Sequence, residues 1–134
     1  MHVPWRMAVI GPVFALVLST SCAFDLADVR YAPTRFDESQ QEDPQSFVLS
    51  GDVPLRHAPC GYRRTLRKGT RWRLAGKLPQ GEVFKSDDQT LTLECSNVFE
   101  AYLVIAGKRL VGFFLPVEKG FVAASEPLVL PVER

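Results

Sequence analysis

Histidine is scarce in this sequence: the 134 residues contain two, His2 and His57. The chain also lacks a Gly-rich phosphate loop, an H-E-x-x-H zinc motif and a G-x-S-x-G nucleophile motif. Acidic residues are present, but no spacing singles out the pair of carboxylates that glycoside hydrolysis requires. We therefore expect no catalytic residue, no metal and no cofactor, with His57 as an ordinary exposed loop residue.

Long apolar runs are absent as well. The run over residues 7–18 is twelve residues long, whereas a membrane-spanning helix needs about 20. It follows Arg6 and precedes the small residues 19–21. This order is typical of a signal peptide that is removed on export.

Residues 18–22, Leu-Ser-Thr-Ser-Cys, resemble the lipobox of bacterial lipoprotein precursors. Ser19 stands where that family usually has Leu. The resemblance implies cleavage before Cys22, lipidation of its sulfur and anchoring to a membrane by the lipid. Ala23 after the cysteine, in place of Asp, implies the outer membrane, with the domain facing the periplasm. The alternatives are ordinary secretory cleavage after Ser21 or Ala23 and an uncleaved anchor.

With Cys22 assigned to lipid, Cys60 and Cys95 remain as an even pair in an oxidising compartment. A disulfide between them closes a loop of about 36 residues, which contributes roughly 3–4 kcal/mol on the chain-entropy estimate. Free thiols and a metal site are the alternatives. His57 and Cys60 supply only two neighbouring ligands, too few for a tetrahedral site.

The net charge of the chain changes sign near residue 46. Residues 25–43 hold six acids and two bases, whereas residues 46–134 hold 13 Lys and Arg against 9 Asp and Glu. The acidic stretch has no sustained periodicity, which indicates an extended segment. We expect a signal peptide over 1–21, a lipidated cysteine and acidic tether over 22–45, and one domain over 46–134.

Short apolar stretches alternate with turn residues throughout this domain, as in all-β proteins. Residues 70–78 and 90–95 alternate cleanly between apolar and polar, and Cys95 falls on an inward face. The pattern predicts a small antiparallel barrel or sandwich of about seven strands, closed by one disulfide.

Residues 99–106 and 110–117 are the most apolar part of the domain. They are expected to be central strands joined by a turn at 107–109, with a helix over 98–106 as the alternative. Phe113 and Phe114 must point to opposite sides of a strand. One belongs to the core, and the other lies either inside a closed barrel or in an exposed contact patch.

A basic run interleaved with aromatic residues stands out between residues 62 and 77, which hold seven Lys and Arg and no acid. Such a cluster concentrates anions. The candidate binding residues are Arg63, Arg64, Arg67, Lys68, Arg71, Trp72 and Arg73. The alternative is a solvated face of an edge strand that is protected from aggregation by its charges.

The general form, with a lipid anchor, a tether, one disulfide and a small β domain, is similar to that of many Gram-negative envelope lipoproteins. We expect a non-enzymatic binding module for an envelope protein, lipopolysaccharide or glycan. Nucleic acid is not expected as a partner of an exported protein. The alternatives are an inhibitor of a host or competitor hydrolase, similar in architecture to lysozyme inhibitors, and a glycan hydrolase.

Overall fold

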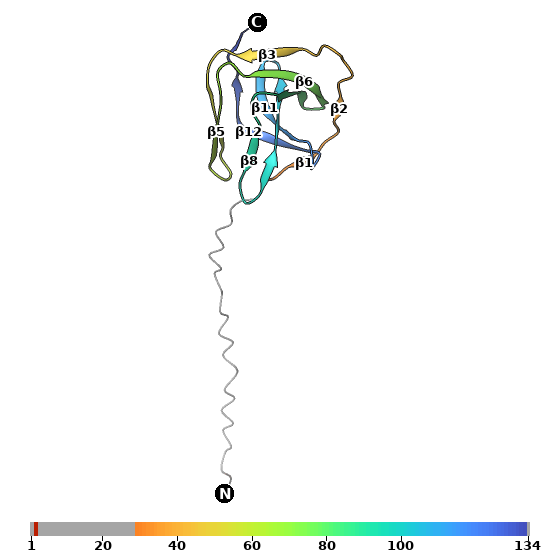
Figure 1. Ribbon diagram of the computed structural model, residues 1–134. Coiled ribbons are helices and arrows are strands. Elements are labelled where there is room, and N and C mark those ends of the chain that lie inside the picture. Colours follow the sequence, from red (N-terminus) through yellow and green to blue (C-terminus); the bar gives the residue numbers. More distant parts are fainter. Residues whose placement is uncertain (1, 3–28, 134) are drawn as a thin grey trace.

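The computed structural model describes His2 and residues 29–133, which form thirteen antiparallel β-strands and no helix (Figure 1). Within these residues, no helix is long and apolar enough to cross a membrane. The all-β class predicted from the sequence is confirmed. Cys22 and the signal sequence lie outside the described residues, so the lipobox stays a prediction.

Nine strands form one sheet. Its hydrogen-bonded order is β1 (Ala32–Pro33), β12 (Gly120–Val129), β11 (Arg109–Leu115), β10 (Tyr102–Ala106), β7 (Gly81–Ser86), β6 (Arg71–Leu78), β3 (Ser46–Leu49) and β13 (Val132–Glu133), with β2 (Asp37–Glu38) also on β6. In the part of the chain that the structure describes, this path does not close on itself. The domain is therefore sandwich-like and not a closed barrel.

Two separate hairpins cover one face of this sheet. They are β4 (Val53–His57) with β5 (Tyr62–Leu66), and β8 (Thr92–Glu94) with β9 (Val98–Glu100). Their inward side chains, such as Leu66 and Leu93, join the main core with Trp72, Leu103 and Phe113 from the sheet. The hairpins thus act as the second layer of the sandwich.

The central strands are buried on both faces. Phe113 belongs to the main core, while Phe114, 1% exposed, lies in a second cluster on the other face with Val83 and Val104. The prediction that adjacent aromatics point to opposite sides is confirmed. Both are covered, so the alternative of an exposed contact patch is wrong.

The cover for Phe114 comes from the segment expected to be a tether. The ring of Phe36 stacks on that of Phe114 at 4.7 Å and 25°. Strand β1 pairs with β12, strand β2 pairs with β6, and Val29 is buried. Residues 32–38 therefore lie along the sheet and cover its outer apolar face with Phe36, whereas Val29 belongs to the main core.

The turn between β10 and β11 is the tight hairpin that the sequence predicts. Gly107 and Lys108 form a two-residue loop, and their φ angles of 56° and 69° are those of a type I′ turn. Because residues 98–106 pair as strands, the alternative of a helix there is wrong.

A substitution at Gly76 tests how closely Phe36 and Asp37 are packed on the sheet. A Cβ at this position would meet the backbone oxygen of Asp37 and the ring of Phe36. We expect Gly76→Ala to lower the free energy of unfolding by about 1–3 kcal/mol, as overpacking does, when measured by urea denaturation. Gly51→Ala is the matched control, since its Cβ would have only Pro131 Cγ nearby, at 3.8 Å. Equal stability of the two variants would contradict this packing.

Candidate functional site: the arginine face of the β4–β5 hairpin

The predicted disulfide between Cys60 and Cys95 is present, with the two Cα atoms 5.7 Å apart. Cys60 lies in the turn of the β4–β5 hairpin, and Cys95 lies in the turn of the β8–β9 hairpin. The bond therefore joins the two hairpins that form the second layer. Cys95 also follows the inward-facing Leu93, as the alternation predicted.

His57, at the end of β4, is buried and not the exposed loop residue that was expected. Its side chain is only 6% exposed, because β4 turns alternate residues inward. Burial lowers the pKa of His57, which favours the neutral imidazole. Its Nδ1 atom is buried and has no hydrogen-bond partner within residues 29–133.

Trp72, one of the candidate binding residues, does not reach the surface. It is 1% exposed in the main core, and its indole N–H donates to Thr70 Oγ1 at 3.0 Å. The prediction that Trp72 contacts a ligand is therefore wrong. The alternation along β6 had put Trp72 on the inward face, and that burial decides its role.

The basic residues of β6 have acidic neighbours. Arg73 forms an ion pair with Asp87 at 2.6 Å, and the backbone N–H of Arg71 donates to the Asp88 carboxylate at 2.7 Å. The Arg67 guanidinium donates to the backbone oxygen of Asp88 at 3.4 Å. The loop after β7 therefore neutralises Arg73 and places the Asp88 carboxylate beside Arg71.

Two other members of the run have structural contacts. The Arg64 guanidinium donates to the backbone oxygen of Thr90 at 2.9 Å and so links β5 to the segment before β8. The backbone N–H of Lys68 donates to the Asp52 carboxylate at 2.7 Å. Arg64 is half-buried for this reason, whereas the Lys68 side chain is exposed.

The side chains of Arg63 and Lys68 remain without a polar contact within residues 29–133, and the fold gives Arg63 a neighbour that sequence analysis missed. The four-residue turn over 58–61 pairs His57 with Tyr62, which sets Arg56 directly opposite Arg63. Both side chains are exposed, and neither has an ion pair or a side-chain hydrogen bond among residues 29–133. The turn length and the alternation of β4 were the signals that could have placed Arg56 here.

Like charges directly opposite on neighbouring strands destabilise a sheet, typically by about 0.2–1 kcal/mol. The two arginines lie in a shallow depression of about 450 Å³, which Pro54 and Thr65 also line from the next outward-facing pair. Two planar guanidinium groups in an open depression suit a carboxylate or phosphate, which can accept hydrogen bonds from both.

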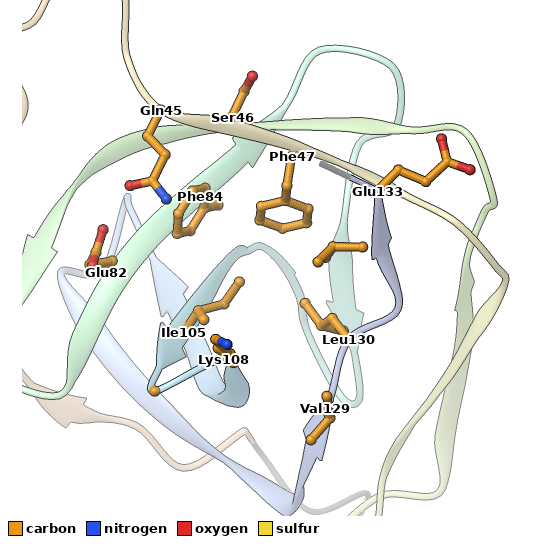
Figure 2. Close-up of a pocket in the computed structure, with 12 residues that line it drawn as sticks. Gln45, Ser46, Phe47, Glu82, Phe84, Ile105, Lys108, Val129, Leu130 and Glu133 are labelled. Carbon is orange, nitrogen blue, oxygen red and sulfur yellow. The ribbon is translucent and has the colours of Figure 1, made fainter.

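A second, larger pocket of about 850 Å³ lies where β3 and β13 approach the β10–β11 turn. Figure 2 shows Phe47, Phe84, Ile105 and Leu130 pointing into it, so its lining is mostly apolar. Its shape and lining suit an alkyl or aromatic group and not an anion.

Comparisons with known proteins give no match to a family model, to a curated protein or to a solved structure.

The opposed arginines generate a prediction about stability. We expect Arg56→Gln to raise the free energy of unfolding by up to about 1 kcal/mol at low salt, because the repulsion from Arg63 is removed. The gain should shrink as salt screens the two charges. Arg109→Gln is the control, since Arg109 is also exposed in a hairpin but faces Val129. Urea denaturation at two salt concentrations measures both, and a loss of stability in Arg56→Gln would contradict the account.

Proposed function

We propose that this chain is a non-enzymatic outer-membrane lipoprotein whose β domain binds clustered phosphate groups of the envelope through Arg56 and Arg63. One observation carries the proposal: two exposed guanidinium groups face each other across the hairpin, without an anionic partner within residues 29–133. An anion between them would turn a repulsive pair into two charge-assisted interactions.

The surroundings of the pair favour anions in general. Residues 52–68 hold five Lys and Arg and one acid, so this hairpin and its flanks are strongly basic. Arginine also presents a planar fork of donors that matches phosphate geometry. In an envelope, the abundant clustered phosphates belong to anionic phospholipids and to lipopolysaccharide.

The proposed lipid on Cys22 would keep the domain near such phosphates. Cys22 is seven residues before Val29, which is buried in the domain. A chain of that length spans at most about 25 Å when fully extended. The anchored domain would therefore stay close to the membrane surface.

The turn of the β4–β5 hairpin, next to Arg56 and Arg63, lies toward the end of the domain where residues 29–31 are found. The ring of Tyr31 contacts that of Phe99 in β9, with centroids 6.3 Å apart. The disulfide ties the turn before β9 to the turn of the β4–β5 hairpin. Figure 1 shows β8 near this end of the domain and β5 along the side, with the turn of its hairpin toward the same end. The anchor and the arginine pair would thus approach the membrane together.

Vesicle co-sedimentation tests the proposal, with a chain that starts at residue 22 and carries Cys22→Ser so that no lipid is attached. We expect binding to vesicles of anionic phospholipid or with lipopolysaccharide, but not to neutral phosphatidylcholine vesicles. Because each basic residue near an anionic surface contributes about 1 kcal/mol, the double variant Arg56→Glu, Arg63→Glu should lose at least roughly tenfold in affinity.

The matched control is Lys108→Glu with Arg109→Glu, which changes the net charge equally at the β10–β11 turn. Its affinity should stay close to that of the unchanged protein. Equal losses in both double variants would mean that net charge alone drives binding, and no loss in either would also overturn the proposal. Comparison of the two anionic vesicles tells which phosphate source is preferred.

A further inference from the structure

Three side chains that can bind metals meet where the disulfide joins the two hairpins. A ring nitrogen of His57 and the sulfurs of Cys60 and Cys95 all lie within 4.8 Å of one another. The sequence brings only His57 and Cys60 together, and the fold adds the third. His57 comes from the end of β4, Cys60 from the following turn, and Cys95 from the turn after β8.

The burial of the His57 imidazole is unusual, because the fold supplies no hydrogen bond to one of its nitrogens within residues 29–133. It is 94% buried, since 6% of its surface is exposed, and its Nδ1 atom has no hydrogen-bond partner within the described chain. An unsatisfied buried polar atom costs about 1–3 kcal/mol. A buried imidazole that has one unpartnered nitrogen within the described chain, and a ring nitrogen close to two sulfurs, is typical of a metal ligand.

In the oxidised protein the two sulfurs are bonded to each other and cannot act as thiolate ligands. A dithiol reductant changes this: its two S–H groups form its own disulfide, and their hydrogens and electrons convert Cys60 and Cys95 to two thiols. Metal binding then displaces one proton from each thiol, since the thiolate is the ligand.

We propose that reduction of the Cys60–Cys95 disulfide creates a binding site for one Zn²⁺ ion, held by His57, Cys60 and Cys95 with water in the fourth position. Zinc–sulfur bonds of about 2.3 Å and zinc–nitrogen bonds of about 2.0 Å place tetrahedral ligand atoms about 3.5–4 Å apart. The His57 nitrogen, which lies within 4.8 Å of both sulfurs, is thus at most about 1 Å outside that spacing, and the two sulfurs move apart to it once their bond is reduced.

Access to the site is open, and the backbone can keep its place. Cys60 and Cys95 are each partly exposed, so a reductant and a hydrated ion can reach the sulfurs. Their Cα atoms are 5.7 Å apart, a separation that two ligands of one zinc ion can span. The metal would replace the covalent link between the two hairpins.

The test uses the full chain with Cys22→Ser in detergent, so that Cys60 and Cys95 supply the only thiols. Zn²⁺ is added to the reduced and oxidised forms, and bound metal is counted after removal of free ion. We expect one Zn²⁺ per reduced chain and none per oxidised chain. Cys60→Ser with Cys95→Ser should abolish binding, and uptake by the reduced chain equal to that of this variant would overturn the proposal.

The role of His57 is tested by His57→Gln against Tyr62→Phe. Tyr62 faces His57 across the hairpin, and its hydroxyl contacts Thr92 Oγ1 at 3.4 Å without belonging to the site. Loss of a second-shell partner weakens metal sites by about 10–100-fold, so loss of a ligand should weaken Zn²⁺ binding at least as much. Tyr62→Phe should bind as the unchanged chain does, and equal affinities in both variants would contradict the assignment.

The zinc proposal can still be tested if a variant or the reduced chain unfolds. If reduction unfolds the domain, Zn²⁺ should restore its near-ultraviolet circular dichroism, and failure to do so overturns the proposal. If His57→Gln does not fold, the nitrogen resonances of His57 in the unchanged reduced chain decide. The resonance of one ring nitrogen should shift on Zn²⁺ addition, and an unchanged spectrum would exclude the imidazole as a ligand.

Discussion

A single covalent bond, between Cys60 and Cys95, holds together the two hairpins that cover the main core. Each hairpin is a two-stranded unit outside the nine-stranded sheet, and isolated two-stranded hairpins are only marginally stable. The disulfide joins their turns, so the inward side chains of both can pack against Trp72 and Phe113 as one layer. Arg56, Arg63 and His57 lie on the hairpin that this bond ties at its turn.

The β4–β5 hairpin carries two features that stability alone does not favour. On its outward face Arg56 repels Arg63, and on its inward face His57 buries a nitrogen that has no hydrogen-bond partner within residues 29–133. In proteins whose sequence and packing otherwise favour one fold, groups that lower stability tend to lie at functional sites. The phosphate proposal uses the outward face, and the zinc proposal uses the inward face together with the neighbouring turn. The two proposals share the hairpin but involve no common residue.

Local patterns in the sequence predict the strands well but not what covers them. Alternation along residues 70–78 gives β6 and the inward face of Trp72, and Gly107 gives the β10–β11 turn. The packing of Phe36 on Phe114 was missed because one aromatic residue in an acidic stretch has no periodicity. Arg56 was missed for a related reason: it joins the site through strand register, which depends on the turn geometry. The acids beside the β6 arginines, Asp87 and Asp88, also come from another part of the chain.

The proposed function requires an exported, lipid-anchored chain, and its second layer is joined by one disulfide. Intact-mass spectrometry of the protein extracted from its own membrane, with and without reductant, tests the lipid anchor and the disulfide together. The account predicts a chain that starts at Cys22 and carries acyl groups, and whose mass rises by two hydrogens on reduction. A mass without lipid, or one that does not change on reduction, would contradict it.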